Sequence, residues 1–136
     1  MKVLVTGGSG FTGVALVKQL VARGDSVIVF DIGISEPLQS LMENGEDVVS
    51  VVGDITSSPQ ILQTFKIHSP DAVVHLAAAV GAGPTMGNPW RVVEMNVGGT
   101  LHVMEAMRLF DVTRMIYLST EETWGDMNEV NMETDF

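Results

Sequence analysis

Short runs of apolar, often β-branched residues alternate along the chain with longer stretches in which apolar positions recur at helical spacing. The short runs predict five strands, at residues 3–5, 27–30, 48–52, 72–76 and 115–118. They are almost continuously apolar, as is typical of strands that are covered on both faces of a sheet. Strands that alternate with helices favour parallel βαβ units with right-handed crossovers. We therefore predict an α/β fold, a doubly wound parallel sheet of about five strands with helices on both faces.

The stretches between the strands predict helices at residues 11–21, 36–44, 58–65 and 89–107, of which 36–44 has the weakest pattern. Gly24 follows the first helix as a stop signal. Ser58 is expected to be the N-cap of the third helix, with Pro59 in its first turn. The interior of the fourth helix holds Gly98 and Gly99, each of which costs about 1 kcal/mol relative to alanine. We expect these glycines to allow close packing of the backbone against a neighbouring element.

Composition narrows the class of protein. The chain has 136 residues, the size of one domain spanning residues 1–136, and 46% of them are hydrophobic. No apolar run is long enough to cross a membrane, and Met1 leads directly into a predicted strand, so no membrane span or signal peptide is predicted. The absence of cysteine excludes disulfides and fits a cytoplasmic protein. A formal net charge of −10 disfavours nucleic acids and anionic membranes as partners.

A glycine-rich loop, Thr6-Gly7-Gly8-Ser9-Gly10-Phe11-Thr12-Gly13, lies between the first predicted strand and the first predicted helix. Gly8, Gly10 and Gly13 fit the spacing G-x-G-x-x-G, and Gly7, Gly10 and Gly13 fit the variant T-G-x-x-G-x-x-G. The early glycines allow a tight turn and close approach of the backbone to a pyrophosphate, and the last glycine lets helix and strand pack closely. The N-terminus of the helix offers unpaired N–H groups and a positive dipole end to the phosphates.

Asp31 follows directly after the second predicted strand. A carboxylate at that position can bind both ribose hydroxyls of NAD and would repel the 2′-phosphate of NADP. A solvated loop with an incidental aspartate is the alternative, but the strand–loop–helix context favours dinucleotide binding. The first 31 residues therefore predict a Rossmann-type site with NAD as the cofactor.

Four further motifs follow in order: Gly53-Asp54-Ile55, His75-Leu76-Ala77-Ala78, Asn96-Val97-Gly98-Gly99-Thr100 and Ser119-Thr120-Glu121-Glu122-Thr123-Trp124-Gly125. Together with the glycine loop and Asp31, they resemble the extended short-chain dehydrogenase/reductase family, which contains the NAD-dependent sugar-nucleotide epimerases and dehydratases. The resemblance covers essentially the whole chain. The ordered set is far more specific than any single motif.

The resemblance implies a set of cofactor-binding residues, namely Gly7, Gly10, Phe11, Thr12, Gly13, Asp31, Asp54, Ile55, Ala77, Ala78 and Asn96. Asp54 would accept a hydrogen bond from the adenine amino group, with Ile55 beside the ring, although a simple turn acid is the alternative. Ala77 and Ala78 would line the path of the nicotinamide ribose, because their small side chains admit the cofactor. Asn96 is expected to brace the backbone at a strand end rather than to be an exposed polar residue.

The three histidines are candidates for a base or for metal ligands. His75 lies within an apolar predicted strand and is interpreted as a hydrogen-bonded structural residue rather than a base. His68 and His102 have no acidic or histidine partners at the spacing of metal ligands, so no metal site is predicted.

The resemblance also places catalytic residues just past the fifth predicted strand, at the edge where doubly wound sheets bind ligands. Thr120 matches the family's catalytic serine or threonine, and Glu121 and Glu122 stand where sugar-nucleotide 4,6-dehydratases carry an aspartate and a glutamate. Paired carboxylates with separated pKa values can act as acid and base when water is removed. Two solvated loop acids are the alternative. Trp124 is interpreted either as a stacking platform or as a core aromatic.

The family's Tyr-x-x-x-Lys motif, which supplies its proton-transfer tyrosine, does not occur in this sequence. The single tyrosine, Tyr117, lies in the fifth predicted strand, and no lysine follows Lys66. We expect a chain cut off before that motif and before the substrate domain, with a natural short form as the alternative. The helix at residues 89–107 would then expose apolar surface, which favours a homodimer or other self-association, with poor stability as the alternative.

Two functional hypotheses follow. The first is an NAD-dependent epimerase/dehydratase-like protein acting on a nucleotide sugar, of which this chain supplies the dinucleotide-binding half. The second is a non-catalytic NAD-binding module, either a sensor or a truncated relic. Binding of NAD without turnover would favour the second hypothesis.

Overall fold

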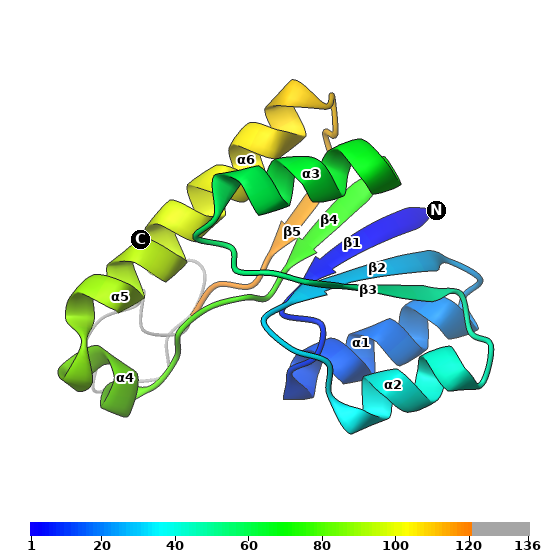
Figure 1. Cartoon of the computed structure of the whole chain (residues 1–136), viewed down its shortest axis with the longest axis horizontal. Helices are drawn as coiled ribbons and strands as arrows, with labels where there is room; N and C mark the ends of the chain where they lie inside the picture. The colour runs from blue at the N-terminus through cyan, green and yellow to red at the C-terminus, as the bar shows by residue number, and fades with distance from the viewer. Residues whose placement is uncertain (121–136) are drawn as a thin grey trace, which may run out of the picture.

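The computed structural model describes residues 1–120, which form a five-stranded parallel sheet in the order β3-β2-β1-β4-β5 (Figure 1). The strands are β1 (Lys2–Thr6), β2 (Ser26–Asp31), β3 (Val48–Val52), β4 (Ala72–His75) and β5 (Met115–Tyr117). The helices are α1 (Phe11–Ala22), α2 (Glu36–Glu43), α3 (Ser58–His68), α4 (Ala82–Gly87), α5 (Pro89–Val93), the π-helical η1 (Glu94–Gly99) and α6 (Thr100–Leu109). The predicted α/β class and doubly wound parallel sheet are confirmed.

Alternate residues of the central strands face two separate cores, because successive side chains of a strand point to opposite faces. On one face, Leu4, Phe30 and Val73 pack with buried residues of α3 and α6. On the other face, Val3, Val5 and Val29 pack with buried residues of α1 and α2. Figure 1 shows the corresponding layers, with α1 and α2 on one side of the sheet and α3 and α6 on the other.

The strand order places the candidate site. After β3 the chain crosses to β4, which pairs with β1 on the side opposite to β2. The order therefore reverses between β1 and β4, and ligands of open α/β sheets bind outside the carboxyl ends of the strands at such a reversal. The ladder continues past the assigned strand ends, since Leu76 N donates to Thr6 O at 3.0 Å and Leu118 N donates to His75 O at 3.2 Å.

One cap prediction is wrong. Ser57, rather than Ser58, has the extended backbone of the N-cap of α3, with φ −98° and ψ 94°. Ser58 is already the first helical residue, which moves Pro59 to the second position of the first turn. Proline is tolerated there because the N–H groups of the first turn have no partner within the helix.

The predicted helix at residues 89–107 is divided in the structure into α5, η1 and α6. Gly99 lies in the last position of η1, and a Cβ atom there would come within 2.6 Å of Cδ1 of Ile55, so its close packing is confirmed. A Cβ atom on Gly98 would meet nothing within 4 Å, so the same expectation is wrong for Gly98. The short helix α4 was not predicted, because it is glycine-rich and has no apolar periodicity.

Candidate dinucleotide site

A cleft of about 620 Å³ opens at the carboxyl ends of β1, β2, β3 and β4. All the predicted cofactor-binding residues except Asn96 line it, namely Gly7, Gly10, Phe11, Thr12, Gly13, Asp31, Asp54, Ile55, Ala77 and Ala78. These residues come from four separate loops of the sequence. The fold brings them together because parallel strands all end at the same edge of the sheet.

The glycine loop follows the T-G-x-x-G-x-x-G spacing. Gly7 has a φ of +73°, and a Cβ atom on it would lie 2.7 Å from N of Ala77. A Cβ atom on Gly13 would lie 2.3 Å from O of Gly7, so helix α1 can approach the loop this closely only because residue 13 has no side chain. Gly8 packs against Cγ1 of Val29 and does not line the cleft. The glycines that shape the cradle are therefore Gly7, Gly10 and Gly13.

Helix α1 begins directly at the cleft, with Gly10 as its N-cap in an extended conformation. Gly10 provides no side-chain cap, and the first turn contains no acidic residue. The N–H groups of this turn have no acceptor within the helix and carry the positive end of its dipole. In a chain with a net charge of −10, this end of α1 gives the cleft a local means of holding phosphates.

Asp31 ends β2 and lies half-buried in the wall of the cleft. Its Oδ2 accepts a hydrogen bond from N of Ser9 at 2.9 Å, and its Oδ1 accepts one from N of Ile32 at 2.7 Å. The hydroxyl of Ser9 donates to O of Gly33 at 2.7 Å. The carboxylate that the sequence assigns to the ribose therefore also ties the glycine loop to the loop after β2.

Asp54 lies in the cleft wall at the end of β3 and carries an ion pair that sequence reasoning missed. Nη2 of Arg91, in helix α5, donates to Oδ2 of Asp54 at 2.5 Å. N and Oγ1 of Thr56 donate to Oδ1 at 2.9 and 2.8 Å. Burial raises the pKa of Asp54, but the hydrogen bonds from Thr56 and Arg91 outweigh it and hold the pKa below its ordinary value. Asp54 is therefore an ionised acceptor rather than a donor.

Asn96 lies behind the cleft and binds the backbone of the β4–α4 loop at two points. Its Oδ1 accepts from N of Ala79 at 2.7 Å, and its Nδ2 donates to O of Ala79 at 2.9 Å. Ala77 and Ala78 precede this contact and line the cleft. The predicted brace is present in the geometry, and Asn96 acts on the cleft through the loop rather than from its wall.

His75 is buried at the end of β4, with both ring nitrogens bonded to hydroxyl groups. Nδ1 lies 2.6 Å from Oγ1 of Thr6, and Nε2 lies 3.0 Å from Oγ1 of Thr100. Burial lowers the pKa of His75 to about 4, so the ring is neutral at physiological pH. These contacts agree with the structural role predicted for His75. Among residues 1–120, no group of three or more histidine, aspartate and glutamate residues could hold a metal ion.

Thr120 lies at the same edge of the sheet, two residues after Leu118, which lines the cleft. Glu121, Glu122 and Trp124 lie outside the described residues.

The wall of the cleft also contains apolar residues that were not predicted from the sequence: Ile32, Ile34, Val80, Met95 and Leu118. The signal that could have revealed Ile32 and Ile34 is their position in a polar loop next to Asp31. A glycine cradle, a helix N-terminus and apolar walls together fit a ligand with phosphates and flat rings.

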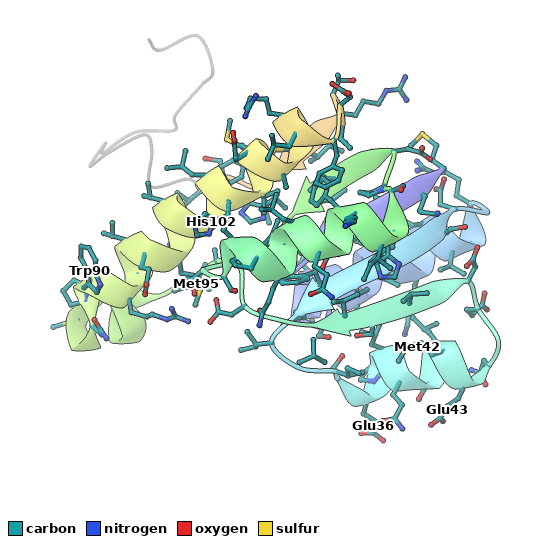
Figure 2. All side chains as sticks on the ribbon, turned by 45° about the horizontal axis from the view of Figure 1, so that its top comes forward. Glu36, Met42, Glu43, Trp90, Met95 and His102 are labelled. Carbon is teal, nitrogen blue, oxygen red and sulfur yellow. The ribbon has the colours of Figure 1, made fainter. Side chains whose placement is uncertain are left out.

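No described helix has both the length and the apolar character needed to span a membrane. Figure 2 places Met95 and His102 toward α3, whereas Trp90 lies near the far end of α5.

Comparisons with known proteins agree with this geometry. The family model described as "NAD dependent epimerase/dehydratase family" matches residues 3–136. A CDP-paratose 2-epimerase of Salmonella typhi is 35% identical over 95% of this chain and 39% of its own length. A UDP-glucose 4-epimerase of Klebsiella pneumoniae is 31% identical over 96% of both chains. The chain thus spans about two fifths of the first relative and nearly all of the second.

Solved structures show the same fold. The UDP-glucose 4-epimerase of Brucella ovis, in complex with NAD, has a TM-score of 0.83 at 30% identity and covers 95% of this chain and 38% of that one. The UDP-glucose-4-epimerase of Stenotrophomonas maltophila, with bound NAD and formylated UDP-arabinopyranose, has a TM-score of 0.88 at 27% identity and covers 98% of this chain and 41% of that one.

Proposed function

The chain belongs to the NAD-dependent epimerase/dehydratase family. From this premise we propose that it binds NAD in the cleft and that it supplies the dinucleotide-binding half of an enzyme that acts on a nucleotide sugar. The cofactor of the family is NAD. The observation that carries the proposal is the cradle in which Cβ atoms on Gly7 and Gly13 would clash, next to the uncapped start of α1. This arrangement lets the backbone approach a pyrophosphate closely.

The residues of the cleft would hold the parts of NAD in order. The glycine loop and the first turn of α1 would bind the pyrophosphate, and Asp31 would bind the adenine ribose. Asp54 and Ile55 would lie at the adenine, and Ala77 and Ala78 would lie along the nicotinamide ribose, with Asn96 bracing their loop. When bound, NAD would supply the chemistry of hydride transfer at a sugar carbon.

Thr120, Glu121 and Glu122 are proposed as the residues that act on the sugar. A hydroxyl at Thr120 would hydrogen-bond a sugar oxygen at the edge of the sheet where the cleft opens. Glu121 and Glu122 would serve as acid and base if the reaction removes water. Relatives with 30% or more identity are named for CDP-, UDP- and dTDP-linked sugars, which supports a nucleotide sugar as the substrate class.

The proposal is tested by titrating the protein with NAD in a calorimeter and by following the NADH absorbance band in the presence of UDP-, dTDP- and CDP-sugars. We expect NAD to bind and a nucleotide sugar to perturb the nicotinamide signal. A Thr120→Val variant should still bind NAD, and in a full-length protein it should lose turnover. No binding of NAD by the parent protein would overturn the proposal.

A second candidate function is an NAD-binding module without catalysis. It is the second of the two functions that the sequence indicated. General acid–base groups contribute roughly 10²- to 10⁴-fold to rates, so a measurement of turnover separates the two functions. Binding of NAD with no nicotinamide signal from any of the sugars would select this module.

Self-association is also proposed, through one face of the helices α5, η1 and α6. Trp90, Val93, Val97, Leu101 and Met104 follow one another at helical spacing and are each more than half exposed. We call these five residues the apolar stripe. An exposed stripe of this kind is typical of an interface, and a second copy of the chain could place the same stripe against it about a twofold axis.

A further inference from the structure

Arg91 joins two walls of the candidate site. Its Nη2 donates to Oδ2 of Asp54 at 2.5 Å, and its Nη1 donates to Oγ1 of Thr56 at 3.2 Å and to Oε2 of Glu94 at 3.0 Å. Asp54 and Thr56 belong to the loop after β3, whereas Arg91 and Glu94 belong to the helical run after β4. One guanidinium group therefore fastens two segments that lie 37 residues apart in the sequence.

The hydrogen bonds that Asp54 receives determine which acceptor position of its carboxylate stays open. An ionised carboxylate offers about four lone-pair positions. N and Oγ1 of Thr56 occupy Oδ1, and Arg91 occupies one position of Oδ2. Among the described residues, these donors leave one acceptor position on Oδ2, and Asp54 lines the cleft. The cleft thus has a fixed acceptor at the end of β3.

We propose that Arg91 is a positioning residue that holds Asp54 so that the site prefers a purine with an exocyclic amino group over one with a carbonyl at that position. The inference rests on the proposed function, in which Asp54 lies at the adenine. An amino group donates to the held oxygen, whereas a carbonyl oxygen meets it as a second acceptor and is repelled. Because Arg91 and Thr56 orient the carboxylate beforehand, little of its freedom is lost when the dinucleotide binds.

Arg91 also offsets the charge of Asp54. No lysine or arginine among residues 1–120 lines the cleft, and the net charge of the chain is −10. An unpaired carboxylate would repel the phosphates of any dinucleotide, with or without the amino group. Removal of Arg91 therefore has two separable effects, since loss of charge weakens all dinucleotides alike and loss of orientation reduces the preference among them.

The two effects are separated by titrating the protein with NAD and with nicotinamide hypoxanthine dinucleotide, in which a carbonyl replaces the adenine amino group. A hydrogen bond to a charged group corresponds to about 10- to 100-fold in affinity, so the parent should bind NAD more tightly by about that factor. In Arg91→Gln we expect the ratio of the two dissociation constants to fall by about 5-fold or more. Arg91→Lys, which keeps the charge and can keep one bond, should restore part of the ratio.

Arg108→Gln is the matched control, because Arg108 lies in the same helical run and pairs with Glu105 three residues away. It should leave both dissociation constants unchanged. Asp54→Asn should lower the ratio as Arg91→Gln does, since an amide can also donate to the carbonyl. If NAD binds the parent but the ratio is the same in Arg91→Gln, the role of Arg91 is overturned. If NAD does not bind the parent, the proposed function is overturned and this inference with it.

Discussion

Nδ1 of His75 lies 2.6 Å from Oγ1 of Thr6, and this contact belongs to a directional chain of hydrogen bonds behind the cleft. Oγ1 of Thr100 donates to O of Asn96 at 2.7 Å, so it accepts at its other contact and Nε2 of His75 carries the proton. Nδ1 of His75 is then an acceptor, and the hydroxyl of Thr6 donates to it. The chain of bonds fixes one tautomer of a buried ring and links β1, β4 and η1.

This buried ring predicts a loss of stability in acid. The pKa of His75 is lowered from 6.5 to about 4 by burial, so the unfolded chain binds more protons than the folded chain between these values. Stability is therefore lost as pH falls through this window, by about 3 kcal/mol in total. Urea unfolding at neutral pH and at about pH 4.5 measures the loss.

The contribution of His75 is isolated by comparing variants. His75→Asn should lower stability at neutral pH but reduce the acid-dependent part, whereas His68→Asn, on a half-exposed position of α3, should behave as the parent does. An equal loss in acid for the parent and for His75→Asn would contradict the assignment.

Asp31→Asn should weaken NAD binding by about 10- to 100-fold, because a charged acceptor for the ribose hydroxyls is replaced by a neutral amide. The preference for NAD over NADP should fall as well, since the charge that repels a 2′-phosphate is removed. Calorimetric titration with both cofactors gives the two values. Glu43→Gln, on an exposed position of α2, is the control of equal charge change. Unchanged NAD affinity in Asp31→Asn would argue against the ribose contact.

Gly98→Ala and Gly99→Ala form a matched pair with opposite expected signs. A Cβ atom on Gly98 enters open space, so alanine should stabilise the protein by about 0.5–1 kcal/mol. A Cβ atom on Gly99 comes within 2.6 Å of buried Ile55 and should destabilise by about 1–3 kcal/mol. The denaturant midpoints of the two variants measure both changes in stability. A stabilising Gly99→Ala would contradict the close packing of Gly99 against Ile55.

Asn96→Ala removes both hydrogen bonds to the backbone of Ala79 and leaves a donor and an acceptor unpaired. We expect a loss of about 1–3 kcal/mol in the free energy of unfolding and weaker NAD binding. Asn96→Asp keeps the acceptor for Ala79 N but places an oxygen against Ala79 O, so it should retain less than half of the brace. Parent-like stability in Asn96→Ala would show that the loop holds its position without the brace.

The apolar stripe predicts that the molar mass in solution depends on its side chains. Leu101 and Met104 are 58% and 51% exposed, so the double change Leu101→Glu/Met104→Glu should not disturb the core. It should convert a dimer into a monomer in sedimentation experiments, because charges at the centre of an apolar interface lose their hydration. Lys18→Glu, on an exposed position of α1, adds acidity elsewhere and should leave the dimer intact. A parent protein that sediments as a monomer at all concentrations would exclude this interface.

The strands, the glycine loop and most of the cleft wall could be predicted because their signals are local. A buried parallel strand such as β2 is a continuous apolar run. The position of Asp31 at the end of this strand is enough to predict that it binds the ribose. Glycine spacing alone does not choose between Gly7 and Gly8, and the prediction of Gly7 rests on the family resemblance. In the structure, a Cβ atom on Gly7 would meet Ala77 and one on Gly8 would meet Val29.

The contacts that link distant segments could not be predicted. The pairing of Arg91 with Asp54 spans 37 residues, whereas the acidic partner that the sequence near Arg91 indicates is Glu94, three residues away. The π-helical turn at Glu94–Gly99 has the same apolar periodicity as the helix around it, so the sequence predicts one continuous helix. The position of this turn is marked instead by tertiary contacts, those of Asn96 with Ala79 and of Gly99 with Ile55.

That π-helical turn has a consequence for how the protein tolerates length changes. A residue in an α-helix advances about 100° around the axis. If α6 stays packed on the core, deletion of one residue within η1 would therefore rotate Arg91 away from Asp54. Relatives with one residue fewer in this turn should have lost this ion pair. Insertions in the loop before α4 would leave both ends of the helical run in register.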